Sequence, residues 1–203
     1  MTAVFKREFR SFFHGMLGYV LTAFLVASSG LYFLARCLIY GLTDFSYYTL
    51  YQTIFMLLLY IPVLAMRSLA EERHSRTDQL LLTSPVSLSG MVLGKYAAAY
   101  TVMAATVVLT LGFVAVVAVY GRVYPSEMAV AYLGFILQGG AFLALDLFIS
   151  GCAKNQVTAA VFAFGANFVL WMLDLLENAV NSSFFSSVLS FFSLYQRAEP
   201  FLM

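Results

Sequence analysis

Five long apolar runs constrain the fold of this chain more than any other feature. A helix needs about 20 largely apolar residues to cross the hydrocarbon core of a bilayer, which is roughly 30 Å thick. The runs that approach or exceed this length are residues 16–39, 48–66, 93–120, 128–150 and 157–173. Backbone amides cannot stay unpaired in lipid, so each run must form a helix. We therefore predict an all-α, polytopic membrane helix bundle with five spans.

Composition and the placement of charge support this prediction and set an orientation. The chain is 62% hydrophobic and only 10% charged, which excludes an ordinary soluble domain. Lys and Arg gather in the cytoplasmic loops of membrane proteins. With the N-terminus inside, eight of the 11 fall on that side: Lys6, Arg7, Arg10, Arg67, Arg73, Arg76, Lys95 and Lys154. No linker divides residues 1–203, so we predict one multi-pass transmembrane domain with a cytoplasmic N-terminus.

The residues before the first run are typical of an amphipathic helix lying on the inner membrane surface. Aromatic residues recur at helical spacing with basic residues between them: Phe5, Phe9, Phe13, Lys6, Arg7 and Arg10. We expect this helix to contact membrane lipids, and a helix that binds a protein partner is the alternative. Residues 178–195 carry separate serine and aromatic stripes, which predict a second interfacial helix on the external side.

One carboxylate lies inside a predicted span. Asp146 falls about one turn from the inner end of the run 128–150. Ionisable residues inside a membrane are functional candidates by default, so Asp146 is a candidate residue of a transport pathway. The alternative is that its carboxylate reaches water or Lys154 at the membrane surface.

The segment between the second and third runs holds much of the scarce charge. Six of the 12 residues at positions 67–78 are charged. Ser75 and Asp78 form a capping-box variant, which predicts a short helix that contains three consecutive leucines and ends before Pro85. Ser87 would then cap the helix of the third span. We expect this short helix to lie across the cytoplasmic face and dock its leucines, and a solvated charged loop is the alternative.

Two motif fragments in this region do not predict an enzyme. The spacing from Glu71 to Arg76 matches the glutamate motif of membrane-embedded CAAX-type proteases, but no histidine follows His74 to hold the hydrolytic water. The stretch from Gly90 only half-matches a phosphate loop, because Tyr96 replaces the hydroxyl that reaches magnesium. We predict no catalytic residue, no metal site and no nucleic-acid partner, so any ATP hydrolysis belongs to another chain.

We call residues 71–86, between the second and third runs, the polar segment. This segment and the sequence around it carry a further pattern. Its parts are Leu69-Ala-Glu-Glu-Arg73, Thr77-Asp-Gln-Leu-Leu-Leu-Thr-Ser-Pro-Val-Ser87, Val92-Leu-Gly-Lys95, Leu147-Phe-Ile-Ser150 and Asn155-Gln156. Together they resemble the permease subunit of type-2 ABC transporters, and most closely the branch named for gliding motility. The similarity extends over essentially the whole chain. Members of this family normally have six spans, so we expect a sixth span that this sequence lacks.

The resemblance implies the permease subunit of an ATP-driven exporter in the bacterial cytoplasmic (inner) membrane. Such a permease pairs with a second permease, as a homodimer or a heterodimer, and binds an ABC ATPase subunit that holds ATP and Mg. The polar segment would be the coupling helix, with contacts from Glu71, Glu72, Arg73, Arg76, Thr77, Asp78, Gln79, Leu80, Leu81, Leu82 and Pro85. The chain itself would have no cofactor. Two alternatives stay open: a secondary transporter or channel, and a non-transporting membrane scaffold.

Overall fold

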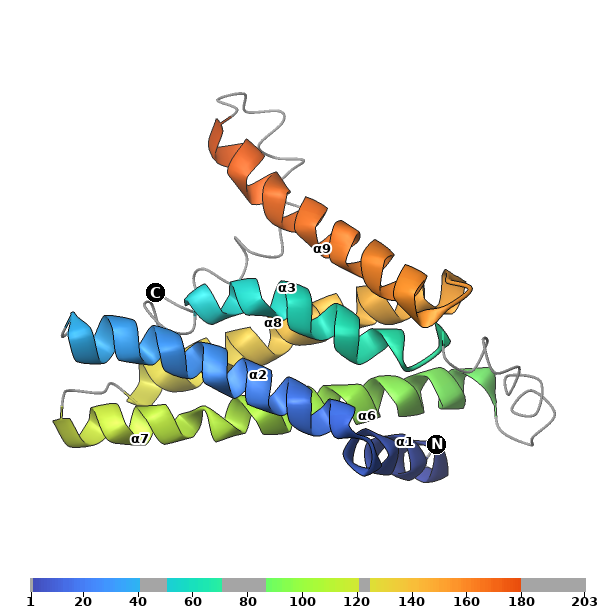
Figure 1. Cartoon of the computed structure of the whole chain (residues 1–203), viewed down its shortest axis with the longest axis horizontal. Helices are drawn as coiled ribbons and strands as arrows, with labels where there is room; N and C mark the ends of the chain where they lie inside the picture. The colour runs from blue at the N-terminus through green and yellow to red at the C-terminus, as the bar shows by residue number, and fades with distance from the viewer. Residues whose placement is uncertain (1, 41–50, 71–86, 121–124, 180–203) are drawn as a thin grey trace.

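All regular structure in the described part of the chain is helical. The computed structural model describes residues 2–40, 51–70, 87–120 and 125–179. In chain order its elements are α1 (Thr2–His14), α2 (Met16–Phe33), η1 (Leu34–Ile39), α3 (Tyr51–Met66), α6 (Leu88–Leu109), α7 (Leu111–Tyr120), α8 (Pro125–Cys152) and α9 (Gln156–Ala179). This architecture confirms the predicted all-α membrane bundle (Figure 1).

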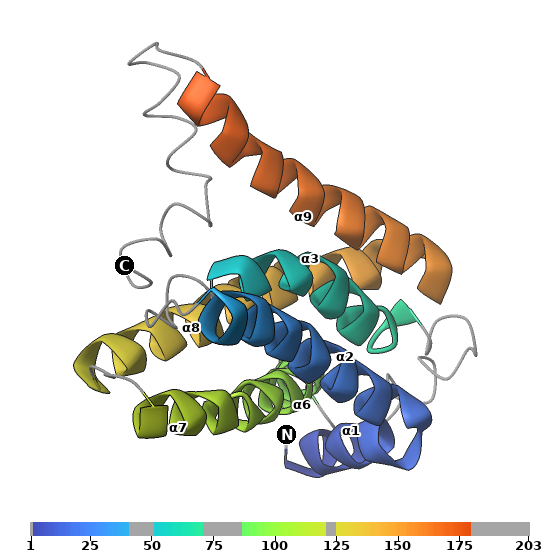
Figure 2. The same cartoon turned by 60° about the vertical axis from the view of Figure 1, so that its left-hand side comes forward.

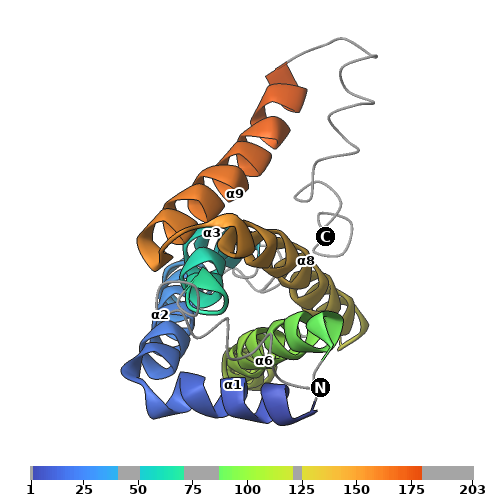
Figure 3. The same cartoon turned by 90° about the vertical axis from the view of Figure 1, so that its right-hand side faces the viewer.

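The helices form a bundle with one crosswise helix and one that leaves it. α2, α3, the α6–α7 pair and α8 run side by side, and α3 packs against α2, α8 and α9 (Figures 1 and 2). α1 packs on α6 and lies across the direction of the bundle (Figure 3). α9 contacts α3 and α8 and then diverges from them. We call the end of the bundle that holds α1, residues 68–70, Ser87 and the α8–α9 turn the polar end.

The five predicted spans differ in length within the described residues. Three helices are long and apolar enough to cross a membrane: Met16–Ile39, Ser89–Val119 and Pro125–Cys152. The other two are shorter apolar helices, Thr53–Met66 and Gln156–Met172. Several helices extend beyond their predicted runs, because a helix continues to its capping residue whereas hydropathy marks only the part that suits lipid.

The third predicted span consists of α6 and α7, which meet at Thr110. α6 begins at Leu88 rather than at residue 93, and Ser87 Oγ accepts a hydrogen bond from the Gly90 amide at 3.2 Å. This bond confirms the predicted N-cap. At the junction the Thr110 hydroxyl donates to the carbonyl of Val107 at 2.6 Å. Thr101 and Thr106 bond back to the preceding turn in the same way inside α6, so this bond alone does not explain the break.

The core lies around α3, and two glycines bring α6 and α8 close together. The most enclosed leucines and isoleucines of α3 are Ile54, Leu57, Leu58, Ile61 and Leu64. A Cβ at Gly139 would lie 2.6 Å from Met103 Sδ, and one at Gly140 would lie 2.8 Å from Tyr100 Cε2. Small residues let membrane helices approach in this way. The contact fixes the spacing between α6 and α8.

The second interfacial helix, predicted over residues 178–195, falls mostly outside the described residues. α9 continues to Ala179. Residues 178 and 179 therefore extend the fifth predicted span instead of starting a separate helix.

Candidate functional site

The residues predicted to contact an ATPase lie outside the described part of the chain. They are Glu71, Glu72, Arg73, Arg76, Thr77, Asp78, Gln79, Leu80, Leu81, Leu82 and Pro85. Both flanks, Ala70 and Ser87, are described, together with the helices that hold them. The residues and helices on both sides of the polar segment are therefore defined, and we call them its frame.

A buried lysine joins three chain segments at the polar end. Lys95, near the start of α6, is 1% exposed. Its ammonium donates to the carbonyl of Ser68 at 2.6 Å and to Glu8 Oε1 at 3.2 Å. A buried ammonium is stable only when it is paired and hydrogen-bonded. These bonds therefore hold α1 and the end of α3 against the start of α6.

Sequence reasoning counted Lys95 among the cytoplasmic cations, which stays a prediction, and missed its partner Glu8. Glu8 is the only acidic residue of α1, and its side chain is 14% exposed. It also accepts a hydrogen bond from Arg7 Nη2 at 2.7 Å. A lone carboxylate among basic residues was the signal that could have pointed to a specific cationic partner.

Some side chains of α1 are buried against the bundle, whereas its basic residues are exposed. Val4 and Phe12 are buried. The exposed basic residues are Lys6, Arg7 and Arg10. The aromatic row consists of Phe5, Phe9 and Phe13, with successive ring centroids 5.9 and 5.1 Å apart. The amphipathic pattern of α1 is present, but part of its aromatic row packs against the core. Its contact with lipid stays a prediction.

The flank of the polar segment at Ala70 is tied to the α8–α9 hairpin. The Ala70 amide donates to Ser150 Oγ of α8 at 3.2 Å. Ala70 also packs with Ala153 and Ala159 in a small apolar cluster. Arg67 reaches the corner between α1 and α2, where a Cβ at Gly15 would lie 2.8 Å from its Nη1. Every helix that meets at the polar end thus contacts the base of the polar segment or its immediate neighbours.

Asp146 is fully buried and bonds to another helix rather than to Lys154, which is exposed. Asn167 Nδ2 of α9 donates to Asp146 Oδ2 at 2.9 Å, and both residues are 0% exposed. Asp146 Oδ1, Asn167 Oδ1 and both amide atoms of Gln138 have no hydrogen-bond partner among the described residues. Sequence reasoning missed Asn167, although an amide inside an otherwise apolar run was the available signal. The pair clasps α8 to α9 within the membrane.

We expect Glu8→Ala to destabilise the protein by about 2–4 kcal/mol, because the buried Lys95 ammonium would lose the Glu8 carboxylate. The double variant Glu8→Ala/Lys95→Met should recover part of this loss, since the buried ammonium is removed together with the carboxylate. Arg7→Ala is the matched control, because Arg7 bonds the same carboxylate from an exposed position. Denaturant unfolding in detergent measures the three free energies. Equal losses in Glu8→Ala and Arg7→Ala would contradict a buried pair.

A second prediction concerns the clasp between α8 and α9. Asn167→Ala removes a donor to Asp146 and should cost about 2–3 kcal/mol, because the carboxylate then stays buried without that bond. Thr101→Ala is the control, since the Thr101 hydroxyl bonds only carbonyls of its own helix among the contacts described. The shift in the unfolding midpoint measures both. A loss in Asn167→Ala no larger than in the control would show that the clasp contributes nothing.

Comparison with known proteins assigns the chain to a family. Residues 39–202 match the family described as ABC-2 family transporter protein. This range covers well over half of the chain, including the polar segment, Asp146 and Asn167. No match is found among curated proteins or among solved structures. The chain therefore belongs to the ABC-2 family of transporter proteins, which are membrane components of ABC transporters.

Proposed function

We propose that this chain is the permease subunit of an ATP-driven exporter in a bacterial inner membrane, with its N-terminus in the cytoplasm. It would form the translocation path with a second permease, identical or related, and would take its energy from a separate ABC ATPase subunit that binds ATP and Mg. The finer assignment to the gliding-motility branch rests on the motifs of the polar segment and stays a prediction.

The observation that carries this proposal is the frame around the polar segment. At one flank Ser68 bonds Lys95 and Ala70 bonds Ser150. At the other flank Ser87 caps α6. A force on a segment held in this way reaches α1, α3, α6 and α8 together. The Ser68–Ala70 flank cannot move without breaking buried polar contacts, and the Ser87 flank continues directly into α6. Such a linkage suits a rigid-body change driven by a partner.

The polar segment would contact the ATPase through both its apolar and its charged residues. Leu80, Leu81 and Leu82 would supply the desolvated contact that carries most of the affinity. The charged residues at positions 71–78 would set encounter rate and register, as charges at the rim of an interface generally do. The α1 residues Phe5, Lys6, Arg7, Phe9, Arg10 and Phe13 would rest against inner-leaflet lipid.

Asp146 is the candidate pathway residue of this proposal. Its support is the burial of a carboxylate with an oxygen that lacks a described partner, which is an expensive arrangement inside a membrane. The same observation would favour a secondary transporter or channel, in which buried charges do the coupling. ATP dependence of transport in reconstituted vesicles separates the two functions. Stimulation of ATP hydrolysis by cargo separates the ATP-driven exporter from a scaffold without cargo.

The proposal predicts that Leu80→Ala/Leu81→Ala/Leu82→Ala releases the ATPase while the permease still inserts and folds. Loss of three buried apolar contacts should weaken the interaction by roughly a hundredfold or more. Leu31→Ala/Leu38→Ala is the control, because these exposed leucines lie in the part of α2–η1 that is far from the polar end. Co-purification of the ATPase with each variant is the measurement. Undiminished ATPase binding to the triple variant would refute the coupling role.

A further inference from the structure

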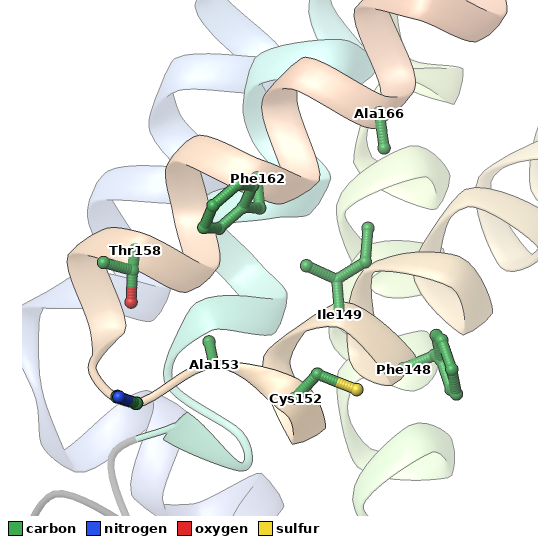
Figure 4. Close-up of a pocket in the computed structure, with 8 residues that line it drawn as sticks. Phe148, Ile149, Cys152, Ala153, Thr158, Phe162 and Ala166 are labelled. Carbon is green, nitrogen blue, oxygen red and sulfur yellow. The ribbon is translucent and has the colours of Figure 1, made fainter.

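A groove between α8 and α9 opens beside the polar end. It has a volume of about 550 Å³, within the range of roughly 300–1,000 Å³ typical of small-molecule sites. Figure 4 shows that Phe148, Ile149 and Cys152 line it from α8, and that Phe162 and Ala166 line it from α9. Exposed apolar side chains are ordinary on a membrane protein, but here they enclose a concave space between two helices.

The groove is polar at one end and apolar along the rest. Lys154, in the turn between α8 and α9, is the only charged residue among the described residues that line it, and it is exposed. From Thr158 to Ala166 the lining extends about 12 Å along α9, at 1.5 Å per residue. This distance is close to half of the roughly 30 Å hydrocarbon core, that is, to one leaflet. The shape and polarity match a phospholipid whose headgroup meets Lys154.

Within the α8–α9 hairpin, the charge beside the groove favours an anion. No Asp or Glu occurs between residues 147 and 173. Asp146, the nearest acid before this stretch, is turned toward Asn167 and fully buried. The start of α9 lies beside Lys154, and Asn155 caps it by accepting from the Thr158 amide at 2.8 Å. A helix N-terminus carries partial positive charge, which adds to that of the ammonium.

We propose that this groove binds an anionic phospholipid of the leaflet at the polar end, with an acyl chain between Ile149 and Phe162 and the phosphate at Lys154. Basic pockets between transmembrane helices bind anionic headgroups by this chemistry. Ala153 lines the groove and also packs against Ala70. The bound lipid therefore shares a wall with the base of the polar segment.

Two substitutions separate the headgroup contact from the chain contact. Lys154→Gln removes the cation, and Ala166→Trp fills the groove. Lys6→Gln removes an exposed cation on α1, and Val169→Trp adds the same ring at an exposed position of α9 that does not line the groove. The last two variants are the matched controls. Size-exclusion profiles and unfolding midpoints identify any variant that does not fold.

The measurement is retention of phosphatidylglycerol against phosphatidylcholine by the purified full chain, followed by native mass spectrometry. We expect Lys154→Gln to lower the preference for phosphatidylglycerol about fivefold, the effect of one cation near a membrane surface. Ala166→Trp should abolish site-specific retention of both lipids, and the controls should behave as the unsubstituted protein. An unchanged preference in Lys154→Gln, or full retention in Ala166→Trp, would overturn the proposal. So would displacement of the lipid by millimolar inorganic phosphate.

A second measurement tests other occupants and does not depend on Ala166→Trp folding. In a Cys37→Ser variant, Cys152 is the one remaining cysteine and lines the groove. Phosphatidylglycerol should slow its reaction with a maleimide at lower lipid concentrations than phosphatidylcholine does. Copper-catalysed disulfide dimers through Cys152 would instead indicate that a second copy of the chain covers the groove. Faster labelling after deletion of residues 180–203 would indicate that this segment covers it. Either outcome overturns the lipid site.

Discussion

The polar end of the structure depends on one buried ammonium. Lys95 has almost no contact with solvent, so its charge must be balanced by protein groups, and those groups come from segments far apart in the sequence. Glu8 belongs to α1 and Ser68 follows α3. Removing Glu8 would take away a countercharge that α6 itself does not supply, because no acidic residue occurs in α6. The position of the crosswise helix α1 and the start of the polar segment are therefore set by the same electrostatic requirement.

Deeper in the bundle a small number of polar contacts hold helices whose surfaces are otherwise apolar. A lipid environment supplies no hydrophobic driving force for helix association. Close packing at small residues and occasional hydrogen bonds therefore determine which helix surfaces pack together. Gly139 and Gly140 serve the first purpose, and the Asp146–Asn167 pair serves the second. α9 contacts α3 and α8 before it diverges from the bundle, and the groove lies between α8 and α9 beside the turn at Lys154. The α8–α9 hairpin thus contacts the base of the polar segment through Ser150 and Ala153, and it also forms the groove.

Much of this architecture could be predicted from the sequence, because a bilayer imposes its length and polarity on any chain that crosses it. Hydropathy located the five apolar helices, and local capping chemistry located Ser87. The sequence could not predict which residue pairs with Lys95 or Asp146, since both partners lie on other helices and depend on how the helices pack. The break at Thr110 was missed for a different reason: apolar residues on both sides give one continuous hydropathic run.

The central claim is that the polar segment faces the cytoplasm and is held there for an ATPase. Its most direct test is a Leu81→Cys substitution in a Cys37→Ser/Cys152→Ser background, labelled with a membrane-impermeant maleimide in vesicles of each orientation. The account predicts labelling only in inside-out vesicles, and protection of the thiol when the ATPase subunit is added. Labelling from the external face, or labelling that the ATPase does not reduce, would contradict it.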